Sequence, residues 1–198
     1  MSSRRAGSIR AFRMRRAKRR GQDTPDVRDR VPNVTPLTGR AGELIRTLGL
    51  EPHPEGGYYR EIFRSSETVV PPDGRGARSA LTTIYYLLAE GTASRWHRVS
   101  SDEVWHLYEG GPLELLEIDD ALTTLTRHRL AAIGDEEGAP VYTIPSGNWQ
   151  AARSLGAYTL VGCTVGPGFD FTDFRMMSAD ADAAARVRVR WPEMGALV

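Results

Sequence analysis

Short apolar runs separated by turn-forming residues make up most of the chain between residues 50 and 166. Residues 80–89 (ALTTIYYLLA) are rich in β-branched and aromatic side chains, and Gly91 ends the run, which is typical of a strand. Similar runs predict further strands at residues 58–65, 94–99, 103–108, 113–118, 122–130, 141–144, 149–153 and 158–165. Because no long helical periods separate these strands, the pattern predicts an all-β fold, either a sandwich or a barrel.

Two short helices flank the predicted strands. Thr38 is in the position of a helix cap, Gly49 is a helix stop, and between them lies one apolar face formed by Leu44, Ile45 and Leu48. A C-terminal helix is predicted over residues 179–188, behind Ser178. The segment Pro167-Gly168-Phe169 predicts a turn that closes one end of the barrel.

The composition predicts one soluble domain. A chain of 198 residues with 40% hydrophobic residues can bury a sizeable core, and no apolar run approaches the roughly 18 residues that a membrane-spanning helix needs or resembles a secretory signal. The lone cysteine, Cys163, cannot form an internal disulfide, which agrees with a cytoplasmic location. We expect residues 1–36 to be a disordered basic extension and linker, residues 38–178 to form the domain, and residues 179–198 to form a C-terminal helix and tail.

The charge is distributed unevenly along the chain. The first twenty residues carry nine basic side chains and no acidic one, which leaves 17 basic against 25 acidic residues, a net charge of −8, in the rest. Such a segment has two interpretations: a tether to nucleic acid or to an anionic membrane, or a disordered, self-repelling extension. A start rich in Arg and Ser also resembles an organellar transit peptide. Because charge runs are weakly specific, we favour the disordered extension and expect no nucleic-acid or membrane partner.

One segment carries the most specific spacing in the chain. Residues 91–110 follow the pattern G-x5-H-x-V-x3-E-x6-G, with His97, Val99 and Glu103 at its centre. Residues two apart on a strand face the same side, so we expect His97 and Val99 to point together. After a short turn, Glu103 and Trp105 share the inward face of the next strand. The spacing therefore predicts an imidazole and a carboxylate that converge inside a barrel.

This spacing resembles the first motif of the cupins, G-x5-H-x-H-x3-E-x6-G, with Val99 in place of the second histidine. The segment Pro145-Ser-Gly147-Asn-Trp149-Gln150 resembles the second cupin motif, P-x-G-x-x-H, with Gln150 in place of its histidine. Two of the four metal-ligand positions are therefore altered, and a transition-metal site generally needs three or more N, O or S ligands. We expect no cofactor; a divalent transition metal held by His97, Glu103 and Gln150 is the alternative.

Several further phrases resemble the cupin-5 family, a group of small uncharacterised cupins known as a domain of unknown function. They follow one another along residues 41–175: HPEGGYY at 53–59, TTIYYLL at 82–88, SDEVWH at 101–106, GGPLELL at 110–116, PSGNWQAA at 145–152 and LVGCTVGPGFDF at 160–171. The resemblance implies a double-stranded β-helix, the cupin jelly roll, usually paired as a homodimer. It implies a pocket but no particular reaction.

The residues of this pocket have two interpretations. His97 and Glu103 suit an acid/base pair that contacts a ligand, because a carboxylate beside an imidazole raises its pKa and orients its ring. The alternative is a buried, mutually satisfied structural pair. We favour the first, and expect the further ligand-contacting residues to be Glu55, Tyr85, Trp105, Trp149 and Gln150.

The remaining titratable residues are expected to lie outside the pocket. We expect His53 and His128 to face solvent, and His106 to face away from the side of the strand that carries Glu103. Cys163 is expected to be a small buried hydrophobe, because the sequence shows no electropositive neighbours that would activate its thiol.

Together these features predict a cytoplasmic, homodimeric cupin that binds a small organic metabolite. As an enzyme it is expected to catalyse proton transfer with His97 and Glu103, as an isomerase, epimerase or lyase; cupins that epimerise nucleotide sugars use a histidine base without metal, which is an analogy of fold alone. One alternative is a metal-dependent cupin oxygenase or isomerase that uses His97, Glu103 and Gln150. Another is a non-enzymatic sensor of a metabolite. The sequence has no glycine loop of the P-loop or Rossmann kind for a nucleotide cofactor.

Overall fold

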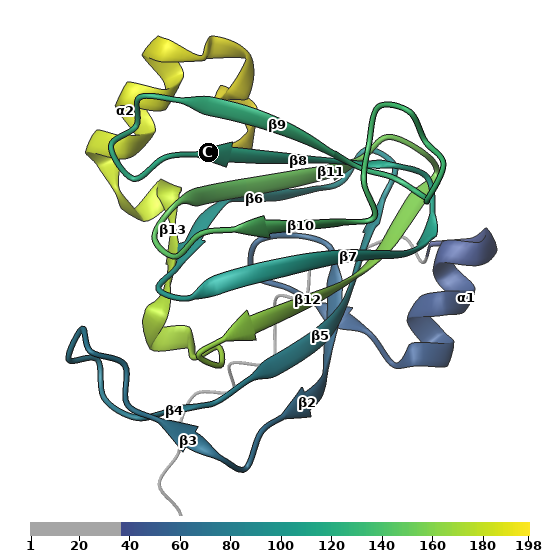
Figure 1. The fold of residues 1–198 in the computed structure, drawn as a ribbon. Coiled ribbons are helices and arrows are strands. Elements are labelled where there is room, and N and C mark those ends of the chain that lie inside the picture. Colours follow the sequence, from purple (N-terminus) through teal and green to yellow (C-terminus); the bar gives the residue numbers. More distant parts are fainter. Residues whose placement is uncertain (1–36) are drawn as a thin grey trace, which may run out of the picture. The chain divides into compact units, whose positions relative to one another are not determined.

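The computed structural model describes residues 37–198, so the predicted disordered extension and linker at residues 1–36 lie outside the described residues. A six-stranded sheet has the order β1 (Glu51–Pro52), β2 (Tyr58–Arg64), β5 (Thr82–Ala89), β12 (Tyr158–Gly166), β7 (Asp102–Gly110) and β10 (Val141–Ile144). A five-stranded sheet has the order β13 (Phe174–Met176), β6 (Ala93–Val99), β11 (Trp149–Ser154), β8 (Leu113–Ile118) and β9 (Leu125–Leu130). The two sheets face each other (Figure 1), and the predicted all-β double-stranded β-helix is confirmed.

Short helices and a small hairpin complete the described chain. Strands β3 (Thr68–Val69) and β4 (Arg78–Ser79) pair with each other, apart from the two large sheets. The α-helices are α1 (Gly39–Leu48) and α2 (Ala181–Arg190), and the 3-10 helices are η1 (Phe171–Asp173), η2 (Met177–Ala179) and η3 (Pro192–Leu197). Within residues 37–198, no helix has the length and apolar character needed to cross a membrane.

Helix α1 follows the predicted pattern. Gly49 ends it in the left-handed conformation, with φ of 62°, a conformation that glycine adopts without a steric cost. Leu44 is buried, and Ile45 and Leu48 pack against the same cluster, which includes Leu87 of β5. The predicted apolar face is therefore the face that joins α1 to the sheet.

Several predicted boundaries differ from the observed ones by one to three residues, and at two of them an aspartate sets the observed boundary. The strand predicted from Leu122 begins at Leu125, because Asp119 accepts hydrogen bonds from the backbone N–H groups of Thr123 and Thr124 and holds residues 119–124 in a turn. The C-terminal helix begins after Asp180, not after Ser178. The side chain of Asp180 accepts a hydrogen bond from the backbone N–H of Ala183 at 3.0 Å.

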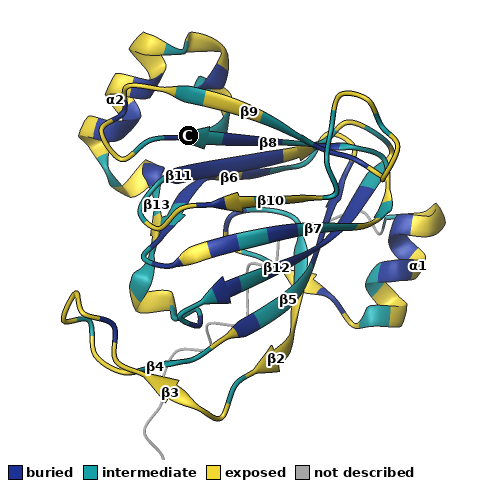
Figure 2. Cartoon of the chain, in the orientation of Figure 1, coloured by how far each residue is buried: buried dark blue, intermediate teal, exposed yellow. Residues whose placement is uncertain are grey.

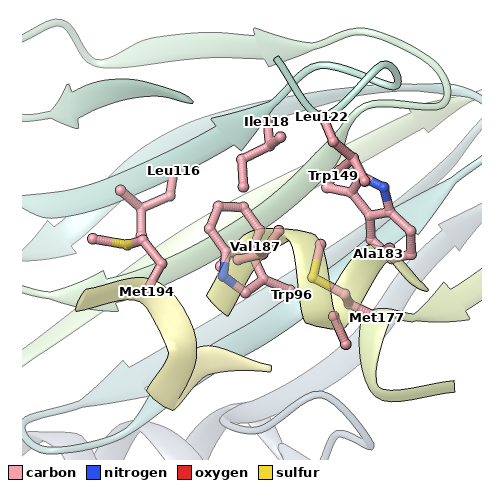
Figure 3. Close-up of a cluster of buried hydrophobic side chains, with 11 residues drawn as sticks. Trp96, Leu116, Ile118, Leu122, Trp149, Met177, Ala183, Val187 and Met194 are labelled. Atoms are coloured by element: carbon pink, nitrogen blue, oxygen red, sulfur yellow. The ribbon is translucent and has the colours of Figure 1, made fainter. Parts of the chain in front are cut away.

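Within the five-stranded sheet, strands β6, β11 and β8 are largely buried, whereas the edge strand β9 is more exposed (Figure 2). The inner face belongs to a cluster that includes Trp105 of β7 and Ala152 of β11. The outer face is covered by α2 and η3, which pack on Trp96 and Trp149 (Figure 3). Strand β11 therefore contributes residues to two different clusters, and the C-terminal segment shields Trp96 and Trp149 from water.

Candidate active site

A cavity of about 310 Å³ is lined by strands of both sheets. Strands β2, β5, β7 and β12 contribute from one sheet, and β6 and β13 contribute from the other. Four of the lining residues form a polar group, which consists of His53, Glu55, His97 and Glu103. Five others form an aromatic wall, which consists of Tyr59, Tyr86, Phe169, Phe171 and Phe174. The structure thus brings the predicted residues Glu55, His97 and Glu103 to one cavity; His97 and Val99 both face it, as expected from strand geometry.

The imidazole of His97 pairs with Glu55. His97 Nε2 lies 3.2 Å from Glu55 Oε2, and His97 Nδ1 donates a hydrogen bond to the backbone carbonyl of Arg95 at 2.8 Å. Because a carbonyl oxygen only accepts, Nδ1 carries a proton and Nε2 is the nitrogen that faces the carboxyl group. Ser94 Oγ donates to Glu55 Oε1 at 2.9 Å. The two side chains are therefore held in fixed orientation, and Glu55 Oε2 faces both His97 Nε2 and, at 3.4 Å, His53 Nδ1.

Burial sets the protonation of the polar group. It raises the pKa of Glu55 and of Glu103 above the ordinary range of a glutamate, and it lowers the pKa of His97 and of His53 below that of a free histidine. All four shifts have the same cause, since removal from water disfavours the charged form of each group. Burial therefore favours the neutral form of each of these groups, which places a proton preferentially on Glu55 rather than on His97.

Glu103 has a different partner from the one that its position predicted. Among the described residues, no ion pair or hydrogen bond joins it to His97, although the two side chains are close enough for the charge of each to act on the pKa of the other. Glu103 Oε2 instead accepts a hydrogen bond from Gln150 Nε2 at 2.5 Å, and Gln150 Oε1 accepts one from Trp105 Nε1 at 3.0 Å. Gln150 and Trp105 therefore orient Glu103 from behind the cavity wall.

The turn between β1 and β2 places Glu55 and His53 at the site. Gly56 has φ of 118°, and a Cβ atom at this position would lie 2.1 Å from the carbonyl oxygen of Ala93, so only glycine permits this approach to β6. Beside it, the backbone N–H of Arg95 donates to the carbonyl of Glu55 at 2.9 Å. The turn is thereby tied to the strand that carries His97.

Two histidines predicted to face solvent are instead largely buried. The side chain of His53 is 7% exposed, and its ring contacts Tyr59 edge-to-face with centroids 4.5 Å apart. His128 Nε2 lies 2.7 Å from Glu117 Oε2, outside the cavity, and its side chain is 18% exposed. One feature of the sequence could have indicated that His53 is buried at the site. His53 lies two residues before Glu55, in a turn whose glycines fold this segment back onto the sheet.

Four residues predicted to contact a ligand do not line the cavity. Trp149 lies on the outer face of its sheet in the cluster under α2, and Tyr85 contacts Tyr108 with ring centroids 6.0 Å apart. Trp105 and Gln150 are fully buried behind Glu103. Direct contact of these four side chains with a ligand in this cavity does not fit the structure.

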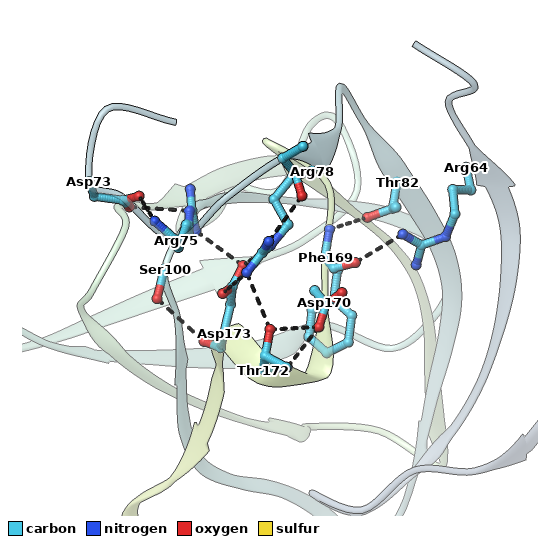
Figure 4. Close-up of polar contacts among 11 residues, drawn as sticks. Arg64, Asp73, Arg75, Arg78, Thr82, Ser100, Phe169, Asp170, Thr172 and Asp173 are labelled. Atoms are coloured by element: carbon cyan, nitrogen blue, oxygen red, sulfur yellow. Dashed lines mark hydrogen bonds and ion pairs between the residues drawn. The ribbon is translucent and has the colours of Figure 1, made fainter. Parts of the chain in front are cut away.

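The aromatic wall was only partly anticipated. The turn at residues 167–169 closes the cavity as predicted, since Phe169 lines it. The backbone N–H of Phe169 donates to Thr82 Oγ1 at 2.9 Å, and the carbonyl of Phe169 accepts from Arg64 Nη1 at 3.1 Å. Further along, Asp173 receives two hydrogen bonds of 2.7 Å from Arg78 (Figure 4). These contacts attach residues 169–173, which carry part of the aromatic wall, to β5 and to the β3–β4 hairpin.

The cupin resemblance implies a metal at the positions of His97, Val99, Glu103 and Gln150, and the residues present do not fit one. Val99 has no donor atom, and both ends of the Gln150 amide are already bonded. Within residues 37–198, no three His, Cys, Asp or Glu side chains are arranged as a metal site. We therefore assign no step of the chemistry to a metal.

Comparison with known proteins agrees with this fold. No curated protein matches the chain. A hypothetical protein from Leishmania major is 32% identical, with a TM-score of 0.68, over 79% of this chain and 94% of that one. A protein from Shewanella oneidensis is 31% identical, with a TM-score of 0.68, over 81% of this chain and 96% of that one. The model of the Cupin_5 family, described as "Cupin superfamily (DUF985)", matches residues 42–177. The chain therefore belongs to the Cupin_5 family of the cupin superfamily.

Proposed function

We propose that this cupin binds a small organic molecule in the cavity and moves a proton on it without a metal, as an isomerase, epimerase or lyase does. The contact between His97 Nε2 and Glu55 Oε2 carries the proposal. It is a buried acid–base pair that faces a cavity, which is the arrangement that proton transfer requires. Glu55 takes the role that the spacing of the motif suggested for Glu103.

The pair acts as a single base and then as the corresponding acid. It takes a proton from a C–H bond beside a carbonyl group, and the electrons of that bond form an enolate. The pair then holds two protons, one on Glu55 and one on His97 Nε2, and carries the positive charge that balances the enolate. Return of the proton to the opposite face of the same carbon gives the epimer. In an α-hydroxy carbonyl compound, delivery of the proton to the former carbonyl carbon, with transfer of the hydroxyl proton to the former carbonyl oxygen, gives the isomer. Departure of a leaving group from the β carbon, which takes the proton from the pair, gives the lyase product.

Two features of the cavity support this chemistry. The carbonyl of Arg95 fixes the imidazole, so that Nε2 is always the nitrogen that exchanges a proton. The aromatic wall covers the pair and keeps water away from a reactive enolate. Glu103, which accepts a hydrogen bond from Gln150, positions the substrate in this mechanism.

Hydrogen–deuterium exchange at carbon tests the proposal. A panel of small α-hydroxy and α-amino carbonyl compounds is incubated with the protein in D2O, and loss of the signal of the proton beside the carbonyl is followed by NMR. We expect the protein to accelerate exchange for at least one compound, and Glu55→Gln and His97→Gln to slow it by about 100-fold or more, the usual scale of acid/base catalysis.

The chain contains a matched control for this experiment. His128 and Glu117 form a similar histidine–glutamate contact of 2.7 Å outside the cavity, so Glu117→Gln and His128→Gln should leave the exchange rate unchanged. Exchange that survives in Glu55→Gln and His97→Gln, or that falls equally in the control variants, would contradict the proposal. Binding of panel compounds without exchange would indicate a sensor in place of an enzyme.

A further inference from the structure

We propose that the molecule bound in this cavity is an organic cation, an amine that carries an apolar or aromatic body. The inference rests on the proposed function, because it assigns the ligand class of the same cavity. It depends on three properties of the lining: its charge, its supply of hydrogen-bond acceptors and its aromatic rings.

The lining contains more acidic groups than free basic ones. Glu55 and Glu103 are buried within it, and Glu61 and Asp170 also contribute to it. Arg64 is the one Arg or Lys among the described lining residues. Its Nε and Nη2 donate to the two carboxylate oxygens of Glu61 at 3.0 and 2.7 Å, and its Nη1 donates to a backbone carbonyl. An anionic ligand would therefore meet carboxyl groups and a guanidinium whose charge is already paired with Glu61.

The buried polar atoms call for a ligand that donates hydrogen bonds. The Tyr86 hydroxyl donates to the carbonyl of Gly56 at 2.8 Å, and His97 Nδ1 donates to that of Arg95. Glu103 is 7% exposed, and Gln150 is the one described residue whose nitrogen or oxygen donates to it. An ammonium group beside Glu103 would donate to the carboxylate lone pairs that Gln150 leaves free and would supply a positive charge beside the carboxyl groups.

The aromatic wall suits the rest of such a molecule. Phe169, Phe171 and Phe174 contact one another with ring centroids 5.0 to 6.1 Å apart. Ring faces attract cations and pack against apolar or planar groups. Burial raises the pKa of Glu103 in the free protein, and an ammonium group beside it would stabilise its ionised form. The cavity is thus complementary to a positive head and an apolar body.

Three probes of nearly equal shape test this assignment. Benzylamine is cationic at pH 7, benzyl alcohol is neutral and benzoate is anionic. Their affinities for the full chain are compared by isothermal titration calorimetry at low ionic strength. We expect benzylamine to bind about tenfold or more tightly than benzyl alcohol, and benzoate to bind most weakly, because a charge pair away from bulk water is worth more than a neutral hydrogen bond.

A variant that removes a charge tests whether the preference for benzylamine arises in this cavity. Glu103→Gln should reduce the advantage of benzylamine over benzyl alcohol to about threefold or less, while binding of benzyl alcohol is retained. Glu114→Gln, which changes a carboxylate that binds Arg127 and Arg153 away from the cavity, should keep the full preference. Thermal melts of both variants show whether they are folded.

Several results would overturn the inference. Benzoate or benzyl alcohol binding as tightly as benzylamine would show that the cavity does not select a cation, and so would an unchanged preference in folded Glu103→Gln. Failure of all three probes to bind would also reject an amine with an aromatic body. The proton-exchange experiment depends on Glu55 and His97 and has its own controls, so it judges the proposed function separately.

Discussion

His97 Nε2 lies 3.2 Å from Glu55 Oε2, and this contact joins the β1–β2 turn to strand β6. The imidazole belongs to the motif that identified the fold, whereas the carboxyl group comes from a turn far earlier in the chain. Ser94 and the carbonyl of Arg95 hold the two partners in place. The chemistry of the cavity therefore depends on a tertiary contact.

We expect Glu103 to make the stability of the protein depend on pH. Its pKa is raised in the folded protein because burial disfavours the carboxylate, so the folded state retains a proton that the unfolded state releases. The contribution is fully present below the ordinary glutamate pKa of 4.5 and is lost as the pH rises through the folded pKa. Relative to Glu103→Gln, the wild type should lose stability with a slope of at most about 1.4 kcal/mol per pH unit.

Urea unfolding of both proteins between pH 4 and pH 8 provides this measurement. The free energy of unfolding of the wild type should fall relative to that of Glu103→Gln as the pH rises above 4.5. A difference that stays constant, or that changes in favour of the wild type, would mean that Glu103 is ionised without cost in the folded protein.

Gln150 is expected to contribute to stability through its two buried hydrogen bonds. Gln150→Leu leaves the indole N–H of Trp105 without its acceptor and removes the donor to Glu103, so we expect a loss of about 1–3 kcal/mol in the free energy of unfolding. Chemical denaturation gives the value. The control is Asn148→Ala, which also removes two hydrogen bonds, but those of a partly exposed side chain, and should cost less.

We expect the purified protein to contain transition metal at well below one ion per chain. Val99 offers no donor, and the amide of Gln150 is occupied on both sides. Val99→His adds a third metal-binding side chain to the cavity beside His97 and Glu103 and should increase retained zinc or nickel. Elemental analysis of the wild type and of Val99→His after identical purification measures the metal content of each protein. A stoichiometric metal in the wild type would contradict this account of the site.

The contact between Arg78 and Asp173 is expected to hold the aromatic wall closed. Asp173→Asn weakens its two 2.7 Å hydrogen bonds, so backbone amides of residues 169–174 should exchange with deuterium about tenfold faster, while those of β8 stay protected. Hydrogen exchange read by NMR or mass spectrometry tests this. Arg127→Gln, at an ion pair with Glu114 on the far sheet, should leave the exchange of this segment unchanged.

Much of the fold followed from local pattern. The strands at 113–118 and 141–144 were predicted with their observed bounds, because turn residues flank both. The spacing of the cupin motif also placed His97 and Glu103 correctly at one cavity. These features depend on residues that are close together in the sequence, and alternation along a strand is enough to reveal them.

The parts of the site that were missed depend on distant contacts. Alternation shows that Trp149 and Gln150 face opposite sides, but it does not reveal that α2 buries the outer side as well. Likewise, the approach of Gly56 to Ala93, which brings Glu55 to His97, is a contact between segments that no local pattern encodes.

The protonation of His97 tests the central claim most directly. Nitrogen-15 NMR of the imidazole distinguishes a protonated from an unprotonated ring nitrogen at each position. We predict that at pH 7 Nδ1 carries a proton and Nε2 does not, in the wild type and in Glu55→Gln, with a pKa for His97 below the free value of 6.5. An imidazolium at pH 7, or a neutral ring protonated at Nε2, would contradict the account, because Nε2 would then have no lone pair with which to take a proton from a substrate.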